Sequence, residues 1–229
     1  MSEPLTLEQL AALREFSTPT ISNAIETFKV RPRNTGFMDH TIACRFPELG
    51  TMVGYAVTAR IRAKGLPDKG EEISHSTVWA EFAKVPKPWV VVIEDLDAPN
   101  LVGSYWGEVN GATYAALGAV GVVTNGGVRD LPEVRRTGFQ FFSAAVLVSH
   151  AYVHVVEAGR PVTVGGLTIT PGDLMHGDEH GVTSVPLEIA IQVPDACRAI
   201  ETAERRLIDY ARSGKATVET LAKIYREVD

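Results

Sequence analysis

The chain has 229 residues, 45% of them hydrophobic, which is enough for one large core or at most two compact units. Its 22 basic and 28 acidic residues give a net charge of −6 with no basic run, which argues against a nucleic-acid groove but not against a small local anion site. No apolar run reaches bilayer-spanning length, and we find neither a secretory leader nor a CxxC motif, so we expect a cytoplasmic protein whose Cys44 and Cys197 are reduced and buried.

The first part of the chain predicts two helices, a long strand and a third helix. Thr6–Gln9 has the form of a capping box and opens an amphipathic helix, and a second helix is expected over Pro19–Phe28. Apolar residues alternate along Val53–Arg62, which predicts a strand with one wetter face. A loop over Gly65–Gly70 and a helix over Glu71–Phe82 follow.

The middle of the chain predicts a strand–helix–strand unit. Trp89–Asp95 is apolar until it ends in acids, and Val120–Thr124 is a shorter run of the same kind, so both indicate strands buried on two faces. Alanines at helical spacing between them place a helix from about Gly107 to Leu117, which Gly118 ends. If the strands are parallel neighbours, the crossover is right-handed and a ligand binds beyond their carboxyl ends.

The last part of the chain predicts further strands and then a helical arm. Strands resume after Gly138 and continue through Val164 and Leu167, and Pro194 opens a charged helical region. The apolar face of that region needs a partner, which a neighbouring subunit can supply. We therefore expect a single domain over residues 1–229, with a core of about 13–186 and a C-terminal helical arm of about 194–229.

Charged residues stand at both ends of the strand–helix–strand unit. Glu108 lies in the first turn of the predicted helix, and Arg129 and Asp130 lie in the loop after the second strand. Twenty residues separate Glu108 from Arg129, enough for a helix, a turn and a buried strand. The spacing predicts that both ends meet at one crevice.

The residue types at this crevice suit a 2-oxo acid. The unpaired N–H groups of the Gly107–Asn110 turn form a seat for a carboxylate, and Arg129 adds a planar fork for the same kind of group. Asp130 and Glu108 supply hard oxygen ligands, which Mg²⁺ or Mn²⁺ prefers. An enolate formed by C–C cleavage would be stabilised by the metal and by Arg129 as its charge develops.

A structural role for the same residues stays open at this point. An Arg-Asp pair after a strand is commonly a surface ion pair. Asp130 is also a good helix cap, followed by Pro132 in the first turn and Glu133 at the capping-box position.

Several other residues favour structural interpretations. His75 on a predicted helix favours packing or hydrogen bonding over catalysis. His150 and His154 are four apart without an evident third ligand, which argues against a zinc site. Turn chemistry accounts for Asp178. Trp106 is the tryptophan placed to wall the crevice.

The order of Glu108, Arg129, Asp130 and Glu133 resembles the signature of a known family. That family contains the ribonuclease activity regulator A proteins and the class II pyruvate aldolases that act on 4-hydroxy-4-methyl-2-oxoglutarate and 4-carboxy-4-hydroxy-2-oxoadipate. The Gly-Gly turn before Arg129 and a late β segment over residues 161–182 support the likeness, which extends over roughly residues 13–186.

The resemblance implies a fold, an assembly and a site. The fold is an α/β, β/β/α sandwich similar to the phosphohistidine swivelling domain, with helical termini, assembled as a homotrimer or homohexamer with sites at subunit boundaries. Asp130, with Glu133 beside it, would bind Mg²⁺ or Mn²⁺. Arg129 would hold the keto oxygen and stabilise the enolate, and Glu108 would position or protonate through a water. The substrate carboxylate would bind at Gly107, Val109 and Asn110.

Two positions depart from the family pattern. Many of its aldolases carry Asp where this chain has Glu108, and the extra methylene would displace a water or the metal by roughly an ångström. His180 stands where the family often has Asp, and no role is carried to it.

The expected activity is that of a metal-dependent lyase that cleaves a C–C bond of a 2-oxo acid and releases pyruvate. The reaction is a retro-aldol cleavage of a 4-hydroxy-2-oxo diacid, a decarboxylation of oxaloacetate, or both. The alternative is a non-catalytic protein-binding regulator of the ribonuclease activity regulator A type. A methyltransferase lacks a visible seat for its cofactor, and no lysine falls in the crevice motif for a Schiff base.

Overall fold

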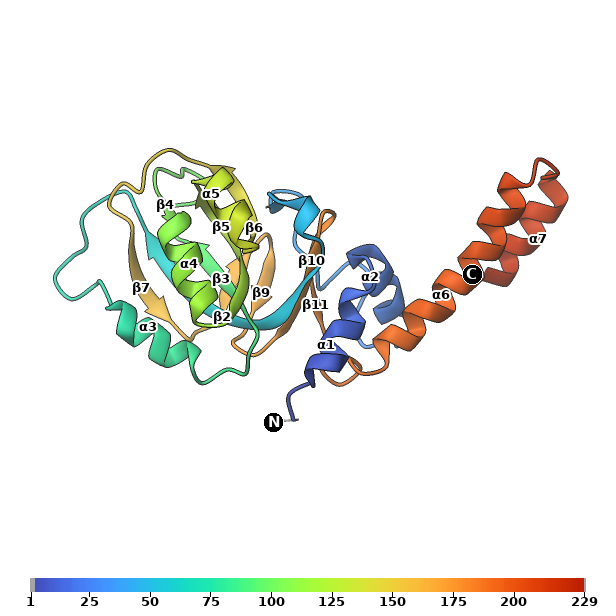
Figure 1. The fold of residues 1–229 in the computed structure, drawn as a ribbon, viewed down its shortest axis with the longest axis horizontal. Helices are drawn as coiled ribbons and strands as arrows, with labels where there is room; N and C mark the ends of the chain where they lie inside the picture. The colour runs from blue at the N-terminus through green and yellow to red at the C-terminus, as the bar shows by residue number, and fades with distance from the viewer. Residues whose placement is uncertain (1–2, 229) are drawn as a thin grey trace.

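The computed structural model describes residues 3–228, which form a mixed α/β fold with a nearly closed sheet and helical ends (Figure 1). The helices are α1 (Leu7–Arg14), α2 (Thr18–Thr27), α3 (His75–Phe82), α4 (Glu108–Ala116), α5 (Leu131–Thr137), α6 (Val193–Arg212) and α7 (Val218–Val228), with a short 3₁₀ helix at Pro47–Leu49. The strands are β1 (Ala43–Cys44), β2 (Met52–Arg62), β3 (Trp89–Asp95), β4 (Ser104–Trp106), β5 (Ala119–Val128), β6 (Gln140–Val146), β7 (His154–Ala158), β8 (Val162–Val164), β9 (Leu167–Ile169), β10 (Leu174–Asp178) and β11 (Gly181–Val185). The expected α/β class is confirmed.

The body has three layers. Nine strands form the main sheet, in the order β1-β6-β5-β3-β2-β10-β11, with β4 beside β5 and β7 beside β2. Helices α3, α4 and α5 cover one face of this sheet, where Phe82, Tyr114 and Val134 are buried. The hairpin of β8 and β9 covers the other face, where Val164 and Ile169 are buried. Helix, sheet and hairpin follow one another, as the β/β/α resemblance implies.

The parallel strands of the main sheet all end at one edge of the body. Strand β3 pairs in parallel with β2 and β5, and β5 also pairs in parallel with β4 and β6. The predicted parallel neighbours, β3 and β5, are therefore confirmed. Because parallel strands end at the same edge, the loops that follow β2 to β6 gather on one side of the body.

Three local predictions were wrong. The helix expected from Glu71 begins at His75, because Ser74 caps it and Ile73 N–H instead bonds Val155 O of β7 at 2.9 Å. The wetter face expected on β2 is dry at Ala56 and Thr58, both 0% exposed, because the β8–β9 hairpin covers it.

The third concerns the glycines before Arg129. They do not form a turn: strand β5 continues through them to Val128, with a register shift between Thr124 and Gly127. A Cβ on Gly127 would overlap the Leu147 side chain, and one on Gly126 would lie 3.0 Å from an Asp95 carboxylate oxygen. Glycine here permits close packing within the sheet.

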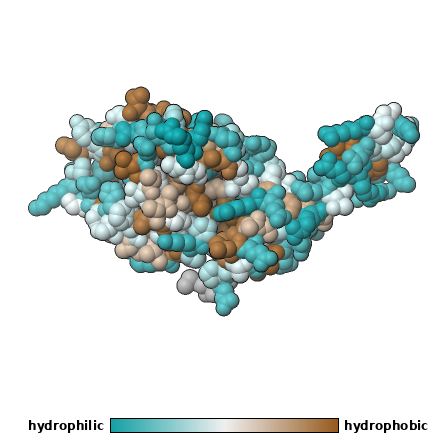
Figure 2. Space-filling model, in the orientation of Figure 1, coloured by the Kyte–Doolittle hydropathy of each residue, from teal (hydrophilic) through white to brown (hydrophobic). Residues whose placement is uncertain are grey.

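The two ends of the chain differ in how firmly they join the body. Helices α1 and α2 and the first turns of α6 share a buried cluster with β2, β10 and β11. Helix α7 packs on the outer half of α6, and the pair projects away from the body (Figure 1). Figure 2 shows apolar side chains within this pair among hydrophilic ones, and Val218 and Tyr225 are 81% and 57% exposed.

Two expectations from composition can be compared with the structure. Cys197 is buried, Cys44 is half-buried, and both are free thiols. Within residues 3–228, no helix combines the length and apolar character needed to cross a membrane.

Candidate active site

A cavity of about 240 Å³ lies at the carboxyl ends of β4 and β5. It is lined by His75, Ser104, Tyr105, Gly107, Val109, Asn110, Arg129, Asp130, His150 and Val153. The lining combines an arginine, a carboxylate and the first turn of α4, with two histidines from other loops. This is the crevice that the strand–helix–strand pattern predicts.

Arg129 and Asp130 are fixed by the strand that precedes them. Arg129 N–H donates to Trp106 O at 2.9 Å, which continues the pairing of β4 with β5. The Arg129 Nε lies 3.7 Å from Asp130 Oδ2, with side chains 34% and 39% exposed. Within residues 3–228, Arg129 Nε is buried and has no hydrogen-bond partner. Because Nε is enclosed beside the Asp130 carboxylate, the exposed part of the guanidinium is the part that can meet an anionic ligand in the cavity.

Asp130 caps a helix, but not the one that follows it. It is the N-cap residue of α5, with φ at 54° and no side-chain capping bond. Its Oδ2 instead accepts the N–H of Glu108 at 3.0 Å. The capping role left open from sequence is therefore transferred to α4, and the carboxylate bridges the ends of β5 and α4. This bond takes one of the free amides expected to bind substrate.

Gly107 makes this arrangement possible. A Cβ at this position would overlap Asp130 Oδ2 and lie 3.2 Å from Arg129 Cγ and Nε. Only glycine lets the strand, the arginine and the carboxylate approach so closely. The neighbouring Asn110 is held by its Nδ2, which donates to Tyr105 O at 2.6 Å. The first turn of α4 is thus locked from both sides.

Tyr105, which lines the cavity, is joined to the buried core beneath it. Tyr105 and Tyr114 share a hydrogen bond of 2.9 Å between their hydroxyl groups, and burial raises the pKa of both. Trp106, predicted to wall the crevice, is instead fully buried beneath it and packs on Tyr114 and Phe139. Its prediction was wrong because Trp106 lies wholly within the buried cluster under α4, whereas Tyr105, in the same cluster, keeps a small exposed part that lines the cavity.

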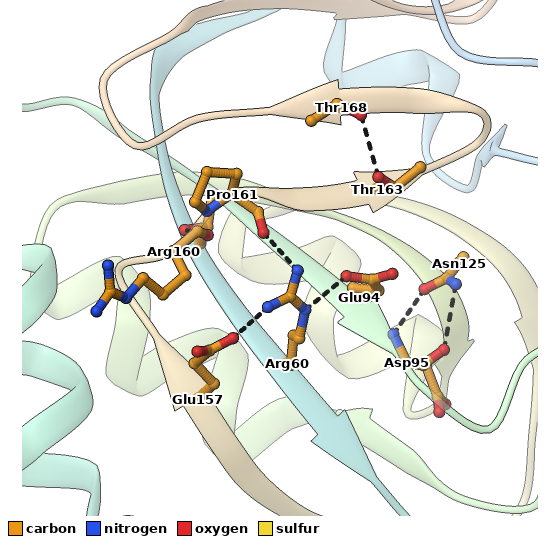
Figure 3. Close-up of polar contacts among 10 residues, drawn as sticks. Arg60, Glu94, Asp95, Asn125, Glu157, Arg160, Pro161, Thr163 and Thr168 are labelled. Carbon is orange, nitrogen blue, oxygen red and sulfur yellow. Dashed lines mark hydrogen bonds and ion pairs between the residues drawn. The ribbon is translucent and has the colours of Figure 1, made fainter.

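Polar contacts behind the site join the ends of neighbouring strands (Figure 3). Asp95 N–H donates to Asn125 Oδ1 at 2.7 Å, and Asn125 Nδ2 returns a bond of 3.2 Å to Asp95 O. Arg60 of β2 meanwhile pairs with Glu94 of β3 at 2.8 Å and with Glu157 of β7. These contacts fix β2, β3, β5 and β7 relative to one another, which holds the strand that carries Arg129 in place.

The structure brings most of the predicted site residues together, but not all. Gly107, Val109, Asn110, Arg129 and Asp130 line the cavity. Glu108 begins α4 with an exposed side chain, and Glu133 lies half-buried in the first turn of α5. Neither belongs to the cavity lining within residues 3–228, so their catalytic and metal-binding roles stay predictions.

Sequence reasoning missed five lining residues: His75, Ser104, Tyr105, His150 and Val153. Three of them lie far from the motif in the chain, on α3 and on the segment before β7. The sequence drew attention to both histidines but did not show where they lie. His75 begins α3 and His150 precedes β7, and only the fold brings them near β4.

The donor set can be tested against the divalent metal that the resemblance implies. Asp130 is a hard oxygen donor that is 39% exposed, and one of its oxygens bonds Glu108 N–H. In the part of the chain that the structure describes, no three His, Cys, Asp or Glu residues are grouped to hold a metal ion. Mg²⁺ needs only one or two carboxylates because it keeps several waters, so Asp130 fits a largely hydrated ion.

Comparisons with known proteins identify the family of the chain. The RraA-like family, described as aldolase/RraA, matches residues 18–184. Protein DlpA of Legionella pneumophila is 29% identical over 144 residues, which are 62% of this chain and 23% of that protein. A putative 4-hydroxy-4-methyl-2-oxoglutarate aldolase of Halalkalibacterium halodurans is 32% identical over 71 residues, which are 31% of this chain and 34% of that protein. The chain thus matches about a third or less of each relative's own length.

Solved structures show the same fold. An uncharacterized protein from Pseudomonas syringae has a TM-score of 0.73 at 25% identity, over 97% of this chain and 96% of that one. Streptomyces coelicolor RraAS2, of the RNase ES inhibitor RraA family, has a TM-score of 0.68 at 21% identity, over 90% of this chain and 98% of that one. Because the family match over residues 18–184 covers well over half of the chain, the chain belongs to the RraA-like family, which includes aldolases and RraA regulators.

Proposed function

We propose that this protein is a cytoplasmic, divalent-metal-dependent lyase that cleaves a C–C bond of a 2-oxo acid and releases pyruvate. The reaction is a retro-aldol cleavage of a 4-hydroxy-2-oxo diacid, a decarboxylation of oxaloacetate, or both. The observation that carries the proposal is Arg129, whose partly exposed side chain lines a cavity beside the Asp130 carboxylate. The name of the Halalkalibacterium relative supports the same class of reaction.

The chain's own residues have distinct tasks in this reaction. The free amides of Val109 and Asn110, in the first turn of α4, bind the carboxylate of the 2-oxo acid. Arg129 donates to the keto oxygen, which gains negative charge when the C–C bond breaks and its electron pair passes into the enolate. In the retro-aldol case the 4-hydroxyl loses its proton, the other fragment leaves as a carbonyl compound, and protonation of the enolate at C3 gives pyruvate. Glu108 positions the water that carries these protons.

The metal would be held by Asp130, with Glu133 at the neighbouring helix turn. Mg²⁺ or Mn²⁺ bound there would supply Lewis-acid stabilisation for the charge on the keto oxygen. The bond from Asp130 Oδ2 to Glu108 N–H fixes the orientation of the carboxylate. One carboxylate oxygen is thus held by a backbone N–H, which would leave the other oxygen for the metal.

We also propose that the protein works as a homotrimer or homohexamer. Exposed apolar side chains surround the cavity on this edge of the body, with Val109, Val148 and Tyr152 exposed by 78%, 97% and 56%. Such side chains around a binding site are typical of a surface that another subunit covers. Light scattering on a sizing column gives the mass of the assembly, and a monomer would contradict this part of the proposal.

The test is pyruvate release from oxaloacetate by the full chain, with Mg²⁺ or Mn²⁺, in the presence and absence of a chelator. Metal without protein serves as the blank, because free metal ions also decarboxylate oxaloacetate. The matched variants are Asp130→Asn and Asp209→Asn, the latter on the exposed face of α6. Asparagine keeps an oxygen that accepts Glu108 N–H but loses the charge, so only metal binding is removed.

We expect metal-dependent release that Asp209→Asn retains and that Asp130→Asn loses at least a hundredfold. Release that persists in the chelator, or in Asp130→Asn, would contradict the metal mechanism. No release from oxaloacetate or from 4-hydroxy-2-oxo diacids by a folded protein would favour the alternative, a protein-binding regulator.

A further inference from the structure

The cavity is lined by two histidines that the proposed reaction does not use. Among its lining residues, Arg129 and Asp130 serve the 2-oxo acid head and the metal, and Tyr105 shares its hydroxyl with Tyr114. The remaining lining groups that can carry positive charge are His75 and His150. A monoanionic pyruvoyl group does not need them.

We infer that His75 and His150 bind a carboxylate on the leaving fragment, and so determine a preference for 2-oxo diacids over 2-oxo monoacids. The assignment rests on the proposed function, because it takes Arg129 and the first turn of α4 as the seat of the 2-oxo acid head. It adds two specificity-determining residues from parts of the chain outside the Glu108–Glu133 motif.

His150 is held by a turn that fixes the direction of its ring. Its Nδ1 lies 2.7 Å from Ala151 O, so Nδ1 carries a hydrogen and donates it, and Nε2 donates to a carboxylate when the ring carries its second proton. Val153 N–H donates to His150 O at 3.1 Å, which closes the turn. Ala151 within this turn has φ at 47°, in the left-handed region that alanine rarely adopts. A non-glycine residue held in this region is a feature that clusters at binding sites.

The body of the protein is shaped to receive this turn. A Cβ on Gly103 would lie 2.5 Å from His150 O and 2.8 Å from the Ala63 Cβ, so glycine is needed where the turn meets the strand. Ser104 N–H donates to Ser149 O at 2.9 Å and continues the contact. The histidine is therefore positioned by backbone bonds from β4, the same strand that lines the cavity through Tyr105.

His75 reaches the cavity from the start of α3. Ser74 caps this helix by accepting Thr77 N–H at 3.2 Å, which sets where its first residue, His75, leaves the helix. The His75 ring stacks on Tyr105, with centroids 6.4 Å apart and planes at 19°. Trp79 lies on the same side, 5.8 Å away. These two aromatic contacts hold the His75 ring at the cavity wall.

The experiment measures binding without turnover. Calorimetric titrations of the metal-loaded full chain compare pyruvate, a monoacid, with 2-oxoglutarate, which has the same 2-oxo acid head and a second carboxylate. The proteins are the wild type, His75→Gln, His150→Gln, the double variant and His150→Arg, with His40→Gln as a control at an exposed histidine.

We expect the wild type to bind 2-oxoglutarate at least tenfold more tightly than pyruvate. Each glutamine variant should lose most of that preference while its pyruvate affinity stays within twofold, and His150→Arg should restore the preference because it restores a cation. His40→Gln should match the wild type. Equal binding of the two acids by the wild type, or an unchanged preference in the double variant, would overturn the assignment.

The readout separates this inference from the proposed function. If wild-type protein shows the diacid preference but releases no pyruvate from oxaloacetate, the lyase proposal fails and the recognition by the two histidines stands. If it releases pyruvate but binds both acids equally, the lyase proposal stands and the assignment of the histidines fails.

Discussion

Two regions of the molecule differ in whether their buried polar atoms have hydrogen-bond partners: the contact of α2 with β10, and the side of the body that contains the cavity. Where α2 meets β10, His176 is fully buried, with Nδ1 3.0 Å from Thr18 Oγ1 and Nε2 3.1 Å from Leu13 O. Asp178 beside it accepts Thr18 N–H at 2.8 Å and His180 N–H at 2.9 Å. Burial would raise the pKa of Asp178, but these hydrogen bonds lower it. Every polar atom named here has a partner, so this side is built for stability.

The cavity side leaves buried polar atoms without partners. Within residues 3–228, these include Arg129 Nε, just after β5, and Asp95 Oδ2, at the end of β3. Burial raises the pKa of Asp95, which reflects the cost of its unpaired oxygen. Unpaired buried groups destabilise a fold. We therefore interpret such groups beside a cavity as an indication of ligand binding there. We infer from this comparison that the α2–β10 side stabilises the fold, whereas the cavity side is less stable because it is arranged to bind a ligand.

The largest expected effect is the loss of activity when Arg129 is removed from the cavity. Arg129→Ala removes the donor to the keto oxygen, and loss of one such donor costs on the order of 10²–10³-fold in kcat. We expect that loss in pyruvate release, with little change in thermal unfolding, because the ion pair with Asp130 is long and partly exposed. Arg136→Ala, at an exposed arginine of α5, is the control and should keep full activity. Normal turnover by Arg129→Ala would refute the role of this residue.

The next effect tests the α2–β10 side through pH. Burial lowers the pKa of His176 from 6.5 to about 4, so the folded state holds the ring neutral. Between these values the unfolded chain binds more protons, so stability is fully present above about pH 6.5 and is lost as pH falls towards 4. The loss is on the order of 3 kcal/mol.

Urea unfolding at several pH values between 7 and 4 measures this loss. The lowered pKa of Asp178 adds a further loss only below its ordinary value of 3.8, so the two contributions are separable. His176→Gln should flatten the pH dependence in this window, whereas His40→Gln should leave it unchanged. A wild-type free energy of unfolding that is flat across the window would contradict a buried neutral His176.

A matched pair of glycine variants gives an intermediate effect. In Gly107→Ala the new Cβ meets Asp130 Oδ2, so the carboxylate and Arg129 must shift. A displacement of about 1 Å at a site costs roughly 10²-fold in rate, and we expect a loss of about 10- to 100-fold in kcat/KM. Gly111→Ala, one turn later in α4, meets nothing closer than 3.6 Å and should stabilise the helix by up to about 1 kcal/mol. Equal activity of the two variants would remove the steric argument.

Sequence patterns predicted the framework of the site because they concern local chemistry. The apolar run of β3 and the spacing from Glu108 to Arg129 identified two parallel strands with a crossover helix, and both were confirmed. The glycines before Arg129 misled, because a Gly-Gly pair predicts a turn from local propensity alone. Their actual use, room for Asp95 and Leu147, depends on strands that only the fold brings together.

The partners of the site residues were the part that sequence could not give. Asp130 was a candidate cap for its own helix, and no local pattern distinguishes that from a bond to Glu108 N–H, a residue 22 positions away in the chain. Likewise His75 and His150 enter the cavity from loops that precede and follow the motif. Such contacts depend on tertiary packing, which periodicity does not encode.

The smallest expected effects are changes in the free energy of unfolding when backbone strain is relieved in each of the two regions. Lys29 follows α2 with φ at 56°, and Ala151 holds the His150 turn with φ at 47°. Glycine adopts this region without strain, so Lys29→Gly and Ala151→Gly should each raise the free energy of unfolding by up to about 1 kcal/mol in urea titrations. Only Ala151→Gly should also weaken 2-oxoglutarate binding, because a looser turn no longer holds the His150 ring in place. If both variants gain stability and bind equally well, strain at Ala151 has no part in the site, and the contrast between the two sides rests on unpaired polar groups alone.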